Sequence, residues 1–337
     1  MNKIKSNFIN SNKLKIFDID AYQLRGKKFF KDIFDYRKKI YSSQKHRIKK
    51  LKDFECNLCK KKKGDIFLIW KDKYQLISCR NCRAISANID LKNEKKFIDS
   101  VYNDKIYTKK VFDAIYKNYN YRKNTFGKER FEYTVKRLKL KKSSRVLDLG
   151  CGFGYYINYL KTKKIFAKGI EPSTDTTKFC VDQLKLNVVS STLETEKNKE
   201  YDLITLFDVI EHLKNPVDYF NQINKKLKKG GYCVAYTPNI HSFSYTIMGS
   251  NQNTMLPFEH LCFFNLDSFK YLAKKTNFEI HSCETFGLDI LDYFLYKEYT
   301  DKIKYNLKLK ELTKYLQPIL DKFGLSNHFR VTFKKKI

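Results

Sequence analysis

The residues with the clearest chemical potential form a glycine-rich turn. Gly150, Gly152 and Gly154 directly follow the apolar segment 146–149. Glycines at alternate positions let the backbone adopt turns that are closed to other residues and let it approach a ligand closely. The apolar segment predicts a buried strand, and the residues after Gly154 predict the start of a helix. A strand, a glycine turn and a helix in this order are typical of a site that binds a nucleotide.

The glycine spacing and one acidic residue narrow the kind of nucleotide. A dinucleotide fingerprint requires G-x-G-x-x-G, but Tyr155 or Ile157 stands where the third glycine is needed. Glu171 lies 21 residues after Gly150, close to the ~20-residue interval at which a carboxylate accepts hydrogen bonds from a ribose. Capping of the helix after Pro172 is the alternative role of Glu171. We therefore expect a ribose-containing ligand that is not a dinucleotide.

Four cysteines form a second group with chemical potential. Cys56 and Cys59 make one Cys-x-x-Cys pair, and Cys79 and Cys82 make another after 19 intervening residues. Four thiolates with this spacing can surround one Zn²⁺ tetrahedrally, with the intervening segment folded as a short hairpin. Such a site has no open coordination position, so the zinc is expected to be structural. Four unrelated thiols and two redox-active dithiols are the alternatives.

A third group follows a predicted strand over residues 201–206. Asp208, Glu211 and His212 have the i, i+3 and i+4 spacing of one helical face, and ligands of open α/β sheets bind at such strand ends. Imidazole titrates near neutral pH, so His212 and the later His260 are candidate general bases. Capping by Asp208 and a hydrogen bond from His212 to a carbonyl are the structural alternatives.

The elements around these residues alternate between strand and helix from Ser144 onward, as a parallel sheet requires. The Gly-Gly pair at 230–231 is expected to end the helix over 217–229. The patterns predict strands over 146–149, 167–170, 187–189, 201–206, 232–236, 278–286 and 327–333, and helices over 155–162, 176–184, 217–229 and 266–275.

The rest of the chain predicts three further segments before this α/β domain. We expect a basic amphipathic segment over 1–50, a zinc-ribbon-like module over 51–92, a helical linker over 93–143 and the α/β domain over 144–337. A helical insertion at about 288–323 would cover a pocket or form a homodimer contact. The polar stretch 241–260 is too long for a simple connector and would form the floor or lid of a substrate pocket. The apolar stripe of the first segment would pack on the protein, with a membrane surface as the alternative.

Composition limits the class of protein. The 337-residue chain carries a net charge of +32, but lysine supplies 58 of the 68 positive charges and arginine only 10. The lysine excess fits a strongly AT-rich coding sequence. Arginine, whose planar guanidinium binds phosphate better than lysine does, is scarce, so a nucleic-acid role is disfavoured. Anionic partners are still favoured. No apolar run approaches ~20 residues and no secretory signal is evident, so we expect no transmembrane segment and a cytoplasmic location.

The run Asp148-Leu149-Gly150-Cys151-Gly152-Phe153-Gly154 resembles the first motif of class I S-adenosylmethionine-dependent methyltransferases. The resemblance covers 144–337 and implies a Rossmann-like, seven-stranded, mostly parallel sheet whose last strand is antiparallel. It also implies contacts to the cofactor. The methionine end of the cofactor would be held by Asp148, Gly150, Cys151, Gly152 and Gly154, and the ribose would be held by Glu171. The adenine would lie against Thr192 and Leu193. The inner wall of the cofactor site would be formed by Phe207 and Asp208.

The four-cysteine module with its helical linker resembles bacterial methyltransferases of surface-polysaccharide and sugar biosynthesis. This second resemblance implies a small-molecule acceptor, namely a sugar, sugar nucleotide or glycan, and structural Zn²⁺. Methylation of tRNA or rRNA is the alternative, favoured by the basic charge and the zinc module. The Leu206-Phe207-Asp208-Val209 sequence differs from the Asn/Asp-Pro-Pro-Tyr/Phe signature of base-amine methyltransferases. A scaffold without activity is disfavoured because Asp148, the glycines and Glu171 are all present.

Overall fold

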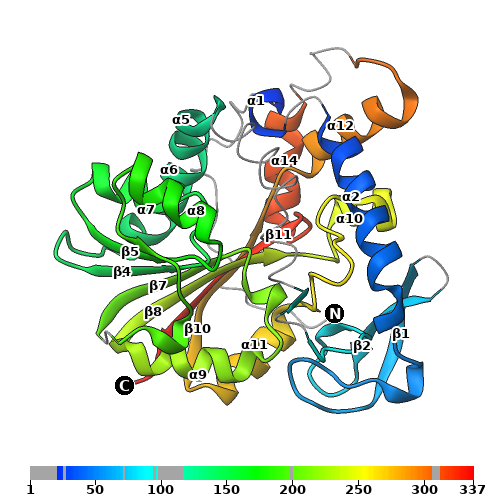
Figure 1. The fold of residues 1–337 in the computed structure, drawn as a ribbon, viewed down its shortest axis with the longest axis horizontal. Coiled ribbons are helices and arrows are strands. Elements are labelled where there is room, and N and C mark those ends of the chain that lie inside the picture. Colours follow the sequence, from blue (N-terminus) through cyan, green and yellow to red (C-terminus); the bar gives the residue numbers. More distant parts are fainter. Residues whose placement is uncertain are drawn as a thin grey trace.

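The chain forms two β-sheets surrounded by helices (Figure 1). The structure is a computed structural model that describes residues 21–25, 28–70, 73–93, 96–97, 117–197, 200–305 and 312–337. Much of the predicted helical linker, namely residues 94–95 and 98–116, lies outside the described residues. The larger sheet comprises β4 (Arg145–Leu149), β5 (Phe166–Ile170), β6 (Val188–Val189), β7 (Tyr201–Phe207), β8 (Leu227–Pro238), β10 (Phe278–Phe286) and β11 (His328–Lys335).

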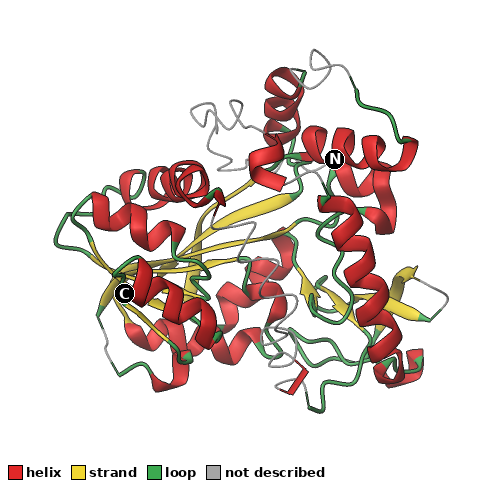
Figure 2. Cartoon of the chain, turned by 45° about the horizontal axis from the view of Figure 1, so that its top comes forward, coloured by secondary structure: helices red, strands yellow, loops and turns green. Residues whose placement is uncertain are grey.

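The order of the larger sheet is β10-β11-β8-β7-β4-β5-β6. Strand β11 runs antiparallel to both β8 and β10, whereas the pairs from β8 to β6 are parallel. Strands β4 and β7 are buried along most of their length because helices cover both faces of the sheet, which explains their continuous apolar sequences (Figure 2). The predicted seven-stranded, mostly parallel α/β sheet with an antiparallel last strand is confirmed.

Helices α5 to α8 lie on one side of this sheet and α9 and α11 on the other (Figure 1). Side-chain caps fix several helix starts: Ser173 precedes α8, Ser242 precedes α10, and Asn265 forms a capping box with Ser268 in α11. The helices are α1 (Ala21–Arg25), α2 (Phe29–Gln44), α5 (Tyr119–Arg122), α6 (Lys128–Phe131), α7 (Tyr155–Thr162), α8 (Thr174–Lys178), α9 (Pro216–Lys226), α10 (Phe243–Met248), α11 (Leu266–Lys275), α12 (Asp289–Asp301) and α14 (Thr313–Lys322).

Helix α9 ends earlier than predicted. The sequence predicts a helix to Lys229 that stops at the glycine pair, but α9 ends at Lys226 and β8 begins at Leu227. Leu227 pairs with Tyr201 at the start of β7 and is buried in the main core. Burial of this leucine against the sheet outweighs the helical propensity of the lysine run. As a result Gly230 does not end the helix but lies inside β8, with a φ of +71°.

The predicted amphipathic helix near the N-terminus is α2, and its apolar side packs on the protein. Phe30 is buried and contacts Tyr296 of α12, with ring centroids 5.6 Å apart. Arg37 of the same helix is buried and donates hydrogen bonds to the carbonyl groups of Ser250 and Gln252. Helix α2 therefore covers the segment that follows β8.

The four-cysteine segment forms the smaller sheet, which is joined to the α/β domain. Its strands are β1 (Gly64–Trp70), β2 (Tyr74–Cys79), β3 (Ile85–Ala87) and β9 (Cys262–Phe263), in that order. The predicted hairpin is the antiparallel pair β1–β2. Strand β9 comes from the α/β domain, and the buried Ile77 and Phe264 belong to one shared core. Within the described residues no helix has the length and apolar character needed to cross a membrane.

The predicted insertion contains α12 and α14. Leu288, at its start, contributes to the wall of a cavity described below, and helix α14 leaves Tyr315, Ile319 and Phe323 more than half exposed. Coverage of a pocket is therefore observed at one end of the insertion. The homodimer contact stays a prediction.

Candidate functional site

A cavity of about 710 Å³ opens beside the glycine turn. Its walls come from this turn, from residues between 122 and 136, from the ends of β7 and β8, and from the start of β11. The carboxyl ends of parallel strands β4, β7 and β8 meet at this edge, and the antiparallel β11 begins there. The location is the one at which open α/β sheets bind ligands.

The three glycines of the turn have different roles. All three have positive φ, between +52° and +70°. A Cβ on Gly150 would lie 2.6 Å from a methyl group of Val209, and one on Gly154 would lie 2.7 Å from Leu186. A Cβ on Gly152 would meet nothing within 4 Å. Gly150 and Gly154 thus allow the turn to pack, whereas the backbone of Gly152 borders open space that a ligand can use.

Glu171 follows β5 and supports the same turn. Its carboxylate accepts hydrogen bonds from the backbone N–H groups of Gly152 and Ser173, both at 2.9 Å. Burial raises the pKa of this carboxyl above its usual value, although the two hydrogen bonds oppose that shift. Each carboxylate oxygen keeps a further lone pair for a hydroxyl donor. Glu171 is not part of the cavity wall, and the same holds for the exposed Thr192 and the buried Leu193.

Asp148 and Cys151 lie beneath the turn. Asp148 is buried in β4 and accepts a hydrogen bond of 2.7 Å from the hydroxyl of Thr205. Burial raises the pKa of its carboxyl to about 7. Cys151 contributes to the cavity wall and packs on Gly169 of β5, where an added Cβ would lie 2.6 Å from its sulfur.

Asp208 contributes a carboxylate to the cavity. It has a φ of +59°, and its side chain is 49% exposed. One carboxylate oxygen lies 3.5 Å from Nε2 of His328, and the other lies 3.9 Å from the guanidinium of Arg130. Burial alone would raise the pKa of Asp208, but the hydrogen bond and charge of His328 and the charge of Arg130 lower it to about 2. Asp208 is therefore an anion at neutral pH.

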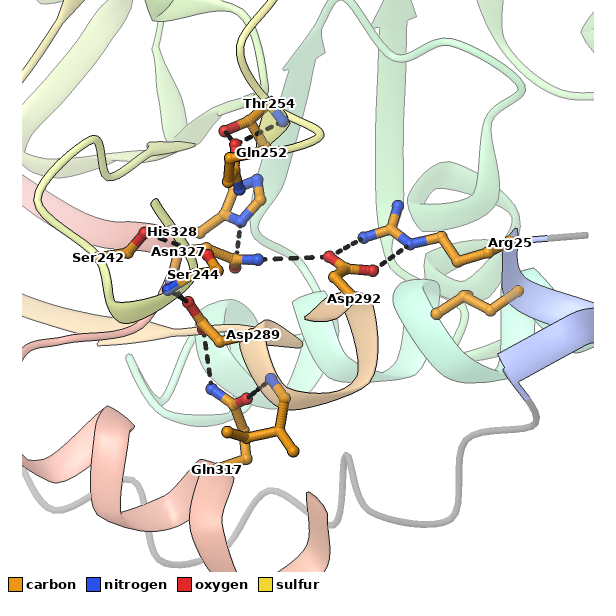
Figure 3. Close-up of polar contacts among 12 residues, drawn as sticks. Arg25, Ser242, Ser244, Gln252, Thr254, Asp289, Asp292, Gln317, Asn327 and His328 are labelled. Atoms are coloured by element: carbon orange, nitrogen blue, oxygen red, sulfur yellow. Dashed lines mark hydrogen bonds and ion pairs between the residues drawn. The ribbon is translucent and has the colours of Figure 1, made fainter. Parts of the chain in front are cut away.

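His328 is oriented by a chain of polar contacts (Figure 3). Its Nδ1 lies 2.8 Å from Oδ1 of Asn327, and the amide nitrogen of Asn327 donates to Asp292 at 3.4 Å. Asp292 in turn accepts two hydrogen bonds from Arg25, at 3.0 and 3.1 Å. Because the amide oxygen of Asn327 can only accept, this arrangement assigns a proton to Nδ1 of His328. Its Nε2 faces Asp208 and the cavity.

The two histidines predicted as general bases lie elsewhere. His212 and His260 are packed against each other, with ring centroids 4.7 Å apart, and neither contributes to the cavity wall. The predicted single helical face for residues 208, 211 and 212 is wrong. Only Ile210–His212 are helical, as one 3₁₀ turn, whereas Asp208 precedes this turn with a positive φ and lines the cavity.

The four predicted zinc ligands are close together. The sulfur atoms of Cys56 and Cys82 are 3.5 Å apart and those of Cys59 and Cys79 are 3.4 Å apart, with all four within 4.8 Å of one another. Zn–S bonds of ~2.3 Å in a tetrahedron require S–S distances of about 3.8 Å. Three of the cysteines are buried. The four thiol groups therefore fit Zn²⁺.

Sequence reasoning missed several residues of the cavity. Arg130 stacks on Phe207, with its guanidinium 4.3 Å from the ring centroid, and it belongs to the segment expected to be a linker. His328 lies in the segment expected to be the last strand. The available signal was its position at the start of an antiparallel strand, because that start adjoins the carboxyl ends of the parallel strands.

Comparison with known proteins identifies the α/β part of the chain. Residues 121–283 match the model of a family described as "Methyltransferase domain". The chain is similar to the ubiquinone biosynthesis O-methyltransferases of Aliivibrio fischeri (strain MJ11), with 29% identity over 133 residues, and of Rickettsia typhi, with 28% identity over 120 residues. These matches span 36% and 33% of this chain and 57% and 49% of the relatives, so the chain spans about half the length of the curated relatives it matches.

Two solved structures are similar to this chain at low identity. A SAM-dependent methyltransferase from Archaeoglobus fulgidus is 24% identical, with a TM-score of 0.43, over 61% of this chain and 94% of that chain. The plantazolicin methyltransferase BpumL is 15% identical, with a TM-score of 0.47, over 72% and 96% of the two chains. Residues 121–283, just under half of the chain, thus resemble a methyltransferase domain, and the order of the larger sheet gives the predicted Rossmann-like fold.

Proposed function

We propose that the protein transfers the methyl group of S-adenosylmethionine to a hydroxyl group of a small molecule bound in the cavity. The observation that carries this proposal is that the Asp208–His328 pair and the glycine turn line the same cavity. A methyl donor on the turn and a hydroxyl beside His328 would then share one cavity, in which an in-line displacement can take place. S-adenosylmethionine supplies an activated methyl group on a sulfonium.

The chain offers a set of groups for the donor. The open backbone of Gly152, together with Asp148 and Cys151 below it, would hold the methionine end, and Glu171 would accept hydrogen bonds from the ribose. Thr192 and Leu193 would lie near the adenine, and Phe207 and Asp208 would form the inner wall. These assignments are supported by the positions of the residues around the carboxyl ends of β4, β5 and β7.

His328 is the acid–base group that the cavity offers. In the neutral imidazole the proton stays on Nδ1 beside Asn327, so Nε2 has a lone pair that can take the proton of a hydroxyl acceptor as the oxygen–methyl bond forms. The carboxylate of Asp208 would stabilise the resulting imidazolium at a distance of 3.5 Å. In this scheme His212 and His260 pack in the structure beside the cavity and take no part in proton transfer.

The cavity favours an acceptor with negative charge. Five cationic side chains contribute to its wall against three carboxylates, and the cations are Arg25, Arg122, Lys128, Arg130 and Lys136. A volume of about 710 Å³ suits a small molecule together with the reactive end of the donor. We propose a sugar, a sugar nucleotide or the end of a glycan as the acceptor. The relatives are named ubiquinone biosynthesis O-methyltransferases, and this name supports a small-molecule oxygen acceptor in preference to RNA.

We also propose that Cys56, Cys59, Cys79 and Cys82 hold one structural Zn²⁺. The thiolates leave no coordination position for a substrate. Their strands share the core of the α/β domain through β9, so the metal would stabilise residues 239–265, none of which lines the cavity.

Isothermal titration calorimetry with S-adenosylhomocysteine tests the donor site. We expect the wild type to bind and Glu171→Gln to bind at least about tenfold more weakly, because a charge-assisted hydrogen bond contributes ~1.5–3 kcal/mol. Glu279→Gln changes an exposed residue of β10 and is the control, with unchanged binding. A wild type that does not bind, or a Glu171 variant that binds equally well, contradicts the proposal.

A pair of glycine variants separates ligand binding from backbone strain. Gly152 and Gly230 both have positive φ, and an added Cβ would meet nothing within 4 Å at either position. Each change to alanine should cost about 1 kcal/mol of stability. Only Gly152→Ala should weaken S-adenosylhomocysteine binding, by tenfold or more in calorimetry, because only Gly152 borders the cavity. Equal affinities for the two variants would place the ligand elsewhere.

A further inference from the structure

A second group of metal-binding side chains lies beside the cavity. Glu211, His212 and His260 each offer one ligand atom, and these atoms lie within 4.8 Å of one another. Glu211 and His212 come from the 3₁₀ turn after β7, and His260 comes from the segment just before β9. The backbone of Glu211 accepts a hydrogen bond of 2.7 Å from Leu261, which fixes the two segments together. The group therefore forms within a rigid part of the fold.

Two buried atoms of this group lack a partner. Glu211 is fully buried, and its Oε1 has no hydrogen-bond partner among the described residues, while Oε2 accepts from Thr237 at 2.9 Å. His260 is 5% exposed, and its Nδ1 likewise has no partner in the described part of the chain. A buried polar atom without a partner costs about 1–3 kcal/mol. These two unpartnered polar atoms thus require an explanation that the contacts among the described residues do not supply.

The third side chain, His212, keeps one ring nitrogen free to bind a metal. The Nδ1 of His212 lies 3.0 Å from the carbonyl oxygen of Glu259. A carbonyl can only accept, so Nδ1 carries the proton and Nε2 keeps its lone pair. A ring N–H that donates to a backbone carbonyl is the usual outer contact of a metal-binding histidine. His212 is therefore oriented as a ligand even though it is unsuited to serve as the general base.

We propose that Glu211, His212 and His260 bind one Zn²⁺ or a chemically similar divalent transition-metal ion. Two imidazole nitrogens and one carboxylate oxygen are a donor set that suits such ions, and three protein ligands leave further coordination positions open. The site is distinct from the four-cysteine cluster, which offers sulfur alone. Hard ions such as Mg²⁺ are disfavoured because they bind mainly through oxygen.

The site adjoins the cavity on the side of Asp208. Asp208 interacts electrostatically with Glu211, His212 and His260, and it is itself exposed to the cavity. A divalent ion in this position would add positive charge to the cavity wall formed by Asp208. Metal binding is inferred from the three side chains and does not depend on methyl transfer.

Spectroscopy with Co²⁺ tests the proposal on the full chain. The protein is first dialysed against a chelator and given one equivalent of Zn²⁺, which the four thiolates take up preferentially. Added Co²⁺ should then bind at one ion per chain and give visible d–d absorption without the sulfur-to-cobalt charge-transfer band. A wild type that binds no Co²⁺, or binds it only with the sulfur band, overturns the proposal.

Variants identify the ligands. Glu211→Gln and His260→Gln should each weaken Co²⁺ binding by at least about tenfold. Glu279→Gln and His281→Gln, which change exposed residues of β10, should bind as the wild type does. Should a ligand variant fail to fold, thermal unfolding of the wild type decides the question, because an ion that binds only the folded state must raise the midpoint temperature as its concentration rises. Equal Co²⁺ affinities for ligand and control variants, or an unchanged midpoint, contradict the site.

Discussion

Replacement of His328 by glutamine should lower the rate of methyl transfer by about 10²-fold or more, the range that a positioned general base contributes. Glutamine keeps the approximate size of the imidazole and a polar end near Asp208 but cannot accept the proton of the acceptor. Because strands β8 and β7 separate His328, at the start of β11, from the glycine turn after β4, S-adenosylhomocysteine affinity should change by no more than about twofold. The measurements are single-turnover rates with an accepted sugar or phenol substrate and calorimetry of the same variant.

The matched control is His241→Gln. His241 is exposed, lies outside the cavity and makes an edge contact with Phe67, with ring centroids 5.4 Å apart. Its replacement tests whether the loss of any histidine near β8 lowers the rate. If His328→Gln turns over at the wild-type rate, or if both variants slow equally, proton transfer by His328 is excluded and the acceptor must be activated by another group.

The elements that sequence reasoning located well are those whose signal is local. The apolar run at 146–149 is buried on both faces as β4, and Asn265 with Ser268 starts α11 at the predicted residue. The glycine turn and the four cysteines were also found because their chemistry depends on short spacings. In each case the physical cause acts within a few residues, so no knowledge of the tertiary structure was needed.

The contacts that sequence reasoning missed depend on the order of the strands. Asp208 follows β7 and His328 begins β11, and these strands flank β8 in the sheet. Since β11 is antiparallel, its start lies at the same edge as the end of β7. His260 meets His212 for a related reason, because β9 pairs with β3 and holds the preceding segment near the 3₁₀ turn. Neither of these two contacts produces a recognisable pattern in the local sequence.

Removal of zinc from the four-cysteine cluster should strongly destabilise the protein. At a free Zn²⁺ concentration one thousand times the Kd, a site that binds only the folded state contributes about 4 kcal/mol. The loss should reach beyond the small sheet, because Cys56, Cys79 and Cys82 are part of the same buried core as Leu206 and Phe264 of the α/β domain. Thermal unfolding with a strong chelator should therefore show a lower midpoint, and Cys79→Ser should show the same decrease without the chelator.

The matched control for this prediction is Cys283→Ala. Cys283 is buried in β10, away from the cluster, so its loss should leave the metal unaffected. Protein loaded with Co²⁺ should show the sulfur-to-cobalt charge-transfer band in the wild type and in Cys283→Ala, and the band should be absent in Cys79→Ser. A band that persists in Cys79→Ser, or a chelator that leaves the unfolding midpoint unchanged, would falsify the structural zinc. The shared core would then have to hold β3 against β9 through apolar contacts alone, among them the buried Ile85 and Phe263.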